Sequence, residues 1–150
     1  QGIYTEWGGP ATIYVPAPQN SPILDSDNYR QIVEDVIRSI AEQQSAVIVG
    51  RAGQMVLRDH PGALHVRIVA ALEDRVQWVM KHEKLDRVAS LKLIKDTDRR
   101  RADYLKSYYK ADWSDPQLYD LVLNASRLGA DSCVAIVLFA LAQKTGVAAG

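Results

Sequence analysis

The sequence has little cysteine and no excess charge of either sign, and each shortage excludes a class of protein. Cys133 is the single cysteine, so the chain can form neither an intramolecular disulfide nor a multi-cysteine zinc site. The 18 Lys and Arg residues balance the 18 Asp and Glu residues, which argues against a simple nucleic-acid or membrane-surface binder. The longest apolar run covers only residues 133–142, whereas a membrane-spanning helix needs about 20 apolar residues.

Export signals and complete catalytic motifs are also missing. Residues 1–7 have neither the basic nor the apolar part of a secretory signal peptide, so the expected compartment is the cytoplasm. The three histidines lack a metal-ligand spacing, and no metal site is expected. The sequence contains neither a Gly-x-Ser-x-Gly nucleophile elbow nor a Gly-x-x-x-x-Gly-Lys-Ser/Thr phosphate-binding loop.

What is present predicts a folded globular protein. Its 150 residues are enough for one core, and its composition is 47% hydrophobic and 24% charged. Residues 1–26 hold four of the six prolines, which predicts an extended arm whose one possible strand, at an edge, is residues 13–15. We expect residues 27–144 to form an α/β domain and residues 145–150 to form a flexible tail.

Apolar periodicity predicts helices that alternate with short buried strands. This alternation is typical of a parallel α/β architecture with right-handed crossovers. The predicted strands are residues 46–49, 64–69 and 121–123, and the predicted helices are residues 27–44, 53–58, 73–82, 87–95, 98–109 and 131–143.

Polar groups follow two of the predicted strands. Ligands of open parallel sheets bind beyond the carboxyl ends of the strands. After the first strand, Gly50 permits a close backbone approach and Arg51 supplies a charged planar fork for a phosphate or a base edge; the alternative is a turn with a surface arginine. After the third strand, Asn124 and Ser126 either contact a nucleobase or cap the last helix.

A third group lies in a basic block. Residues 75–110 contain 11 basic and 5 acidic residues. On a helix, Arg101 shares a face with Asp98 and Tyr104, and neighbouring arginines can clamp the oxygens of a transferring phosphoryl group. The alternative is a solvated helix surface with internal ion pairs, such as Arg99 with Asp103.

Three stretches together resemble the cytidylate kinase-like family of nucleoside monophosphate kinases. They are residues 45–76 (SAVIVGRAGQMVLRDHPGALHVRIVAALEDRV), 95–114 (KDTDRRRADYLKSYYKADWS) and 119–129 (YDLVLNASRLG), and the resemblance covers roughly residues 27–142. It implies a P-loop NTPase-type α/β fold with three layers, a parallel sheet between helices. It also implies phosphoryl transfer from ATP, with Mg²⁺, to CMP, dCMP or a similar nucleotide.

The resemblance also implies roles for individual residues. Arg51 corresponds to the arginine that holds the acceptor nucleotide. The implied catalytic residues are Arg99 and Arg101, as lid arginines around the phosphates, with Asp98 as their neighbour and possible orienter. The implied nucleotide-binding residues are Gly50, Arg51, Arg58, Tyr104, Asn124 and Ser126. ATP and Mg²⁺ are expected for the intact family member, although this chain has no motif of its own for either.

Two departures from the family qualify these expectations. Ala52 stands where cytidylate kinases carry an aspartate, which bears on base selectivity. The family's first strand and phosphate-binding loop would lie before residue 1, giving an N-terminally truncated core, so we expect this chain alone to be inactive. An upstream segment, direct pairing of the flanking strands, or the arm at residues 13–15 of this chain or a neighbour would then fill the gap.

Two function hypotheses stay open on the sequence. The first is a kinase domain whose partners are a small nucleotide and ATP, with no membrane partner and no expected nucleic acid. The alternative is a catalytically inactive, kinase-like module for oligomerisation or nucleotide sensing. Exposed strand edges and apolar faces favour a homo-oligomer, or association with a missing N-terminal segment, under either hypothesis.

Overall fold

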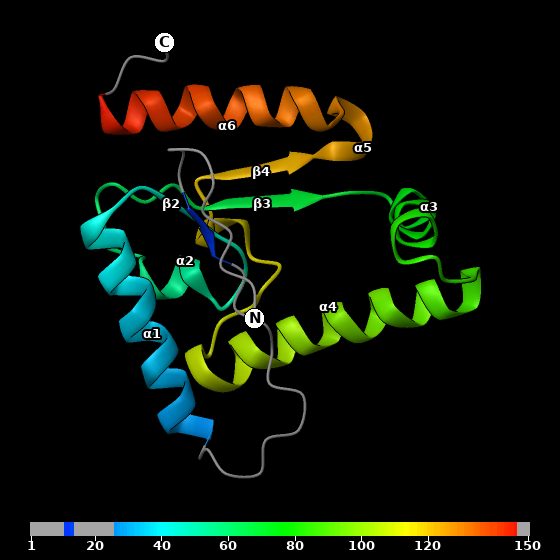
Figure 1. The fold of residues 1–150 in the computed structure, drawn as a ribbon, viewed down its shortest axis with the longest axis horizontal. Coiled ribbons are helices and arrows are strands. Elements are labelled where there is room, and N and C mark those ends of the chain that lie inside the picture. Colours follow the sequence, from blue (N-terminus) through cyan, green and yellow to red (C-terminus); the bar gives the residue numbers. More distant parts are fainter. Residues whose placement is uncertain (1–10, 14–25, 147–150) are drawn as a thin grey trace. The chain divides into compact units, whose positions relative to one another are not determined.

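The computed structural model describes residues 11–13 and 26–146, and its elements alternate between helices and strands (Figure 1). The chain divides into two compact units, Gln1–Ala63 and Leu64–Gly150, which are described separately. The predicted single domain over residues 27–144 stays a prediction. The rest of the predicted arm, with Tyr14 and Val15, lies outside the described residues, as does the tail from residue 147.

The first unit pairs two short parallel strands beside a long helix. Its elements are β1 (Ala11–Ile13), α1 (Ser26–Gln43), β2 (Ala46–Ile48) and α2 (Gly53–Val56). β1 pairs with β2 in a register that sets Ala11 opposite Ala46 and Ile13 opposite Ile48. A strand in the arm therefore forms at Ala11–Ile13 and covers one edge of β2; it shares Ile13 with the predicted strand at residues 13–15, the rest of which lies outside the described residues.

One stripe of α1 supplies the core of this unit. Val33 and Ile37, spaced four residues apart on one helix face, are buried together with Leu57. Ile32 and Val36 lie one residue before them and are exposed, so the apolar surface of α1 is wider than the face that the described chain buries.

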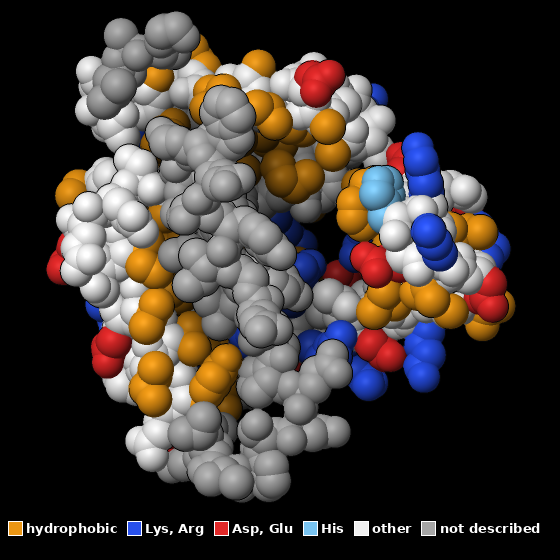
Figure 2. All heavy atoms as spheres, viewed as in Figure 1, with side chains coloured by type: hydrophobic (Ala, Val, Ile, Leu, Met, Phe, Trp, Pro, Cys, Tyr) orange, Lys and Arg blue, Asp and Glu red, His pale blue; other side chains and the backbone are white. Residues whose placement is uncertain are grey.

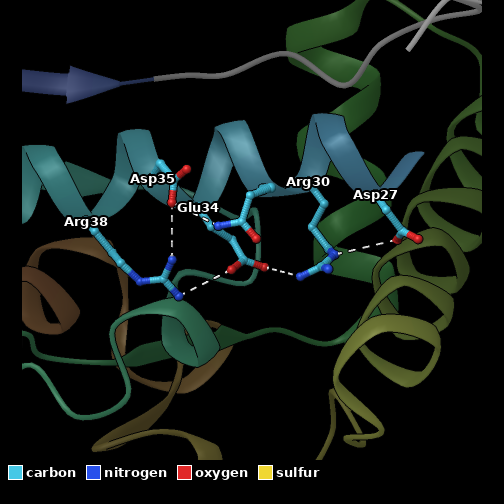
Figure 3. Close-up of polar contacts among 6 residues, drawn as sticks. Asp27, Arg30, Glu34, Asp35 and Arg38 are labelled. Carbon is cyan, nitrogen blue, oxygen red and sulfur yellow. Dashed lines mark hydrogen bonds and ion pairs between the residues drawn. The ribbon is translucent and has the colours of Figure 1, made fainter. Parts of the chain in front are cut away.

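A ladder of charged residues runs along α1 beside this stripe (Figure 3). Glu34 is only 6% exposed, and its two carboxylate oxygens pair with Arg30 at 2.6 Å and with Arg38 at 3.2 Å. Asp27 and Asp35 extend the ladder through longer contacts of 3.9 and 3.6 Å. The two arginines at i±4 therefore compensate the burial of the Glu34 carboxylate.

Replacing Glu34 with alanine should lower the free energy of unfolding by about 1–3 kcal/mol, because two guanidinium groups lose a buried partner. Asp35→Ala is the matched control: this exposed carboxylate lies on the same helix and should contribute less than about 0.5 kcal/mol. Urea denaturation of both variants measures the difference, and equal losses would show that the burial of Glu34 is without consequence.

The second unit holds a parallel strand pair with helices around it. Its elements are β3 (Val66–Val69), α3 (Leu72–Glu83), α4 (Arg87–Tyr109), a 3₁₀ helix (Pro116–Leu118), β4 (Leu121–Asn124), α5 (Ala125–Leu128) and α6 (Ala130–Thr145). β3 and β4 pair in parallel, with Val66 opposite Leu121 and Val69 opposite Asn124. The predicted parallel α/β architecture is confirmed. Among the described residues, β2 pairs only with β1, and β3 pairs only with β4.

The helix α4 is continuous through residues where a break was expected. The sequence predicted separate helices at residues 87–95 and 98–109. That prediction is wrong: the helix runs from Arg87 to Tyr109. It begins at an N-cap, where the Asp86 carboxylate accepts a hydrogen bond from the Ala89 amide at 2.7 Å. Within the described ranges, no helix combines the length and apolar character that a membrane crossing requires.

Candidate functional site

Two guanidinium–carboxylate pairs join α3 to α4. Arg75 on α3 donates both terminal nitrogens to the two oxygens of Asp98 on α4, each at 2.7 Å. Arg87, the first residue of α4, makes the same kind of two-pronged contact with Glu73 at 2.7 and 2.8 Å. Such paired contacts fix direction as well as distance, so α4 is held against α3 at two points.

Hydrogen bonds from Arg87, and then from Gln77, lower the pKa of Glu73 to about 2. Because the pKa of the folded state lies below the ordinary value of 4.5, the contribution of this pair to stability is present above about pH 4.5. It should be lost as the pH falls through about 2. An NMR titration of the Glu73 carboxyl carbon should show this low midpoint, and Arg87→Gln should move the midpoint back toward 4.5. A wild-type midpoint near 4.5 would contradict the paired geometry.

The arginine run follows Asp98 directly on α4, and its three side chains are exposed. Arg100 donates to the Thr97 hydroxyl at 3.3 Å. Within residues 26–146, Arg99 and Arg101 form no hydrogen bond or ion pair, so the alternative pairing of Arg99 with Asp103 is not observed. Their charge is available to an anionic ligand.

The helix separates these two arginines. Arg101 lies on the face of α4 that also carries the buried residues Ile94 (5% exposed) and Leu105 (3% exposed). Arg99 stands roughly 200° away around the helix and points to the opposite side. An exposed, unpartnered arginine on the inward face is the stronger candidate for a phosphate ligand. In Figure 2 the surface is hollowed between β3–β4, α3 and α4, with basic and acidic side chains where α3 and α4 border the hollow.

Tyrosines extend the inward face toward the end of α4. The ring of Tyr104 lies 4.9 Å from that of Tyr108 and 6.2 Å from that of Tyr109. The structure therefore brings Asp98, Arg101 and Tyr104 together within two turns of one helix, as their spacing predicted.

Asn124 and Ser126 lie at the carboxyl end of β4, opposite the end of β3. The Ser126 hydroxyl accepts a hydrogen bond from the Ala71 amide at 2.8 Å and so fixes the residue that precedes α3. Asn124 precedes α5 but makes no capping bond with its side chain, and its buried Oδ1 has no partner within the described chain. The alternative prediction that these residues cap the last helix is therefore not met; Gly129 holds that position.

The Gly50–Ala52 turn and Arg58 lie in the first unit. Gly50, Arg51 and Ala52 follow one another at φ 77°, 55° and 53°, a left-handed turn that only glycine adopts without strain. The turn closes with a hydrogen bond from the Gly53 amide to the Gly50 carbonyl at 3.1 Å. Ala52, the last of the three, is buried. Arg58, which follows α2, is exposed. Strained backbone of this kind often marks a binding site.

Sequence reasoning missed the partner of Asp98. The sequence analysis placed Arg75 in the basic block only. Helical spacing predicts pairs three or four residues apart, whereas Arg75 and Asp98 are 23 residues apart. Sequence reasoning also missed Arg67 on β3, whose guanidinium lies 4.5 Å from the centre of the Trp113 ring.

The described part of the chain contains no group of three or more His, Cys, Asp or Glu side chains arranged to hold a metal ion.

The second unit therefore joins two parallel strands through a helical hairpin that bears an arginine run, an arrangement of the α/β class. The chain belongs to the cytidylate kinase-like family, whose family model matches residues 12–127. The resemblance inferred from the three sequence stretches is thereby confirmed.

Two of the relatives to which the chain is similar are named cytidylate kinases. The chain is 28% identical over 121 residues to the cytidylate kinase of Methanocaldococcus jannaschii, covering 77% of this chain and 68% of that protein. It is 30% identical over 112 residues to the cytidylate kinase of Methanopyrus kandleri, covering 69% and 58%. It is also 29% identical over 115 residues to a Corynebacterium glutamicum protein named uronate isomerase, covering 77% of this chain but 22% of that protein. The chain thus spans only part of each relative.

The fold has a solved counterpart. The crystal structure of an uncharacterized protein from Eubacterium ventriosum superimposes with a TM-score of 0.74 and 24% sequence identity. The match covers 81% of this chain and 69% of that chain. The similarity shows a common fold, including the parallel α/β arrangement predicted from the sequence.

Proposed function

We propose that this chain forms the acceptor-binding and lid part of a nucleoside monophosphate kinase, which transfers a phosphoryl group from ATP to CMP, dCMP or a similar nucleotide. The observation that carries the proposal is Arg101, an exposed arginine without a partner in the described chain, on a helix face whose neighbours are buried. Family membership supplies the class of reaction.

Phosphoryl transfer of this kind depends on positioning and charge neutralisation and needs no covalent intermediate on the protein. Arg101 would donate to phosphate oxygens, and Arg51 would hold the acceptor nucleotide. Tyr104 lies one turn after Arg101, where its ring would border the nucleotide. Asp98 has both oxygens bound to Arg75, so it would act by holding the helix and not by touching the reacting groups.

The cofactors fit this arrangement only in part. ATP supplies the phosphoryl group, and the exposed Arg101 fits the negative charge of a phosphate chain. Magnesium is commonly held by phosphates, water and one or two carboxylates. We propose that it reaches this site with the nucleotide, because the described residues offer no cluster of ligands for it.

Calorimetric titration of the 150-residue chain with CMP, cytidine and ATP tests the proposal. We expect CMP to bind at least about tenfold more tightly than cytidine, since only CMP offers a phosphate to the arginines. A coupled assay for nucleoside diphosphate formation is run on the same sample. Tighter binding of CMP than of cytidine supports the proposal, with or without turnover, because this chain alone is expected to be inactive. Equal affinity for CMP and cytidine, or no binding of either, overturns the proposal.

One observation favours a second candidate, a kinase-like module for nucleotide sensing or oligomerisation. On α6, Val134, Leu138 and Phe139 are each more than half exposed, and an association between copies would cover them. Light scattering during gel filtration measures the subunit number. Binding of CMP without turnover fits both candidates. An oligomer that binds no nucleotide would favour a purely structural module over the kinase, and a monomer that turns over CMP would exclude this second candidate.

A further inference from the structure

We propose that Arg75 is a positioning residue that sets the orientation of Arg101 through Asp98. The inference rests on the proposed function, in which Arg101 binds a phosphate. Nothing in the sequence pattern singles out Arg75, which is one of the basic residues of the block at residues 75–110. Its contact with α4 distinguishes it from the others.

The contact between Arg75 and Asp98 leaves little freedom of rotation. Both terminal guanidinium nitrogens of Arg75 bind, one to each oxygen of Asp98, at 2.7 Å. The two side chains are about one third exposed, so water competes for them less than at a fully exposed pair. A planar fork on a planar carboxylate constrains the direction of both groups.

Asp98 passes this constraint to Arg101 along one turn of α4. The two residues are three positions apart on the same face of a continuous helix. Because both oxygens of Asp98 accept from Arg75, Asp98 acts on Arg101 through the helix backbone. A shift of α4 at Asp98 would therefore move the guanidinium of Arg101 with it.

The other end of the connection is fixed to the strands. The Ser126 hydroxyl, just after β4, accepts from the amide of Ala71, the residue before α3. Arg75 lies in the first turns of α3. Hydrogen bonds thus connect the carboxyl end of β4 to α3, and α3 to the turn of α4 that precedes Arg101.

The second pair between the same helices provides a matched control. Arg87 contacts Glu73 with the same two-pronged geometry, at 2.7 and 2.8 Å. Arg87 is the first residue of α4 and lies far along the helix from Arg101. Breaking this pair removes a similar ion pair between α3 and α4 without releasing the turn beside Arg101.

Calorimetry with CMP on the full chain tests the inference in a double-mutant cycle. The variants are Arg75→Gln, Arg87→Gln, Arg101→Ala and the double variant Arg75→Gln with Arg101→Ala. We expect Arg75→Gln to weaken CMP binding about tenfold and Arg87→Gln less than about twofold. In the Arg101→Ala background, Arg75→Gln should add less than about twofold, because Arg75 acts through the missing side chain.

Each outcome separates the inference from the proposed function. If Arg101→Ala leaves CMP affinity unchanged, the proposed phosphate site itself fails. If Arg101→Ala weakens binding and Arg75→Gln weakens it equally in both backgrounds, the proposed function stands and the positioning role is overturned. Equal losses from Arg75→Gln and Arg87→Gln also overturn the positioning role, since both pairs would then act only on the general stability of the two helices.

Arg75→Lys keeps the measurement possible if Arg75→Gln does not fold. Lysine preserves the charge opposite Asp98 but offers a single ammonium in place of the fork. We expect the Arg75→Lys chain to retain its circular dichroism spectrum and still to bind CMP about threefold to tenfold more weakly than the wild type. Wild-type affinity in a folded Arg75→Lys chain would mean that charge alone suffices and that the fork positions nothing.

Discussion

Replacing Arg101 with alanine should weaken the binding of CMP about 10- to 100-fold, a loss of about 1.5–3 kcal/mol. This is the range for removing a hydrogen-bonding partner from a charged group. The expectation follows from the place of Arg101 on the inward face of α4 beside the buried Leu105, with no partner in the described chain that would hold its charge away from a ligand. Calorimetric titration measures the affinity.

Arg99→Ala and Arg100→Ala are the controls for this experiment. Arg99 points to the opposite side of the helix, and Arg100 donates to Thr97. Each change removes the same charge from the same segment, so each should weaken CMP binding by less than about threefold. Equal effects from all three changes would indicate diffuse attraction by the basic block and would contradict a defined phosphate ligand.

Replacing Leu105 with alanine should lower the free energy of unfolding by about 2–5 kcal/mol, because truncating a buried leucine removes contacts and leaves a cavity. Leu105 is 3% exposed and lies one turn after Arg101, so it is among the buried side chains of α4. Urea denaturation, followed by circular dichroism, measures the loss.

Val88→Ala tests whether burial is the cause. Val88 lies on the same helix but is 77% exposed, so its truncation should change stability by no more than about 0.5 kcal/mol. A comparable loss in both variants would mean that helix propensity, and not packing, accounts for the effect of Leu105→Ala.

Local signals in the sequence predicted most elements of this fold. The apolar run at residues 46–49 became β2, and the apolar spacing around residues 27–44 and 131–143 predicted α1 and α6 to within a few residues. These signals predict the elements because they depend only on residues that are close in the sequence. The same reasoning placed Asp98, Arg101 and Tyr104 on one helix face.

Long-range pairing could not be predicted in the same way. The sequence predicted two helices where α4 is continuous, and it gave no sign of the two-pronged contact between Arg75 and Asp98 on that helix. Likewise, the pairing of β1 with β2 depends on partners more than thirty positions apart in sequence. The positive φ angles of Arg51 and Ala52 had no signal either, because neither residue type favours that conformation.

The left-handed turn after β2 has a consequence for the adaptation of this protein. An arginine at φ 55° costs about 1–2 kcal/mol that a glycine would not. Under the proposed function, a more heat-resistant variant and a better nucleotide binder would therefore require different residues at position 51. If Arg51 holds the acceptor nucleotide as proposed, the backbone strain at this position is a cost in stability that accompanies nucleotide binding.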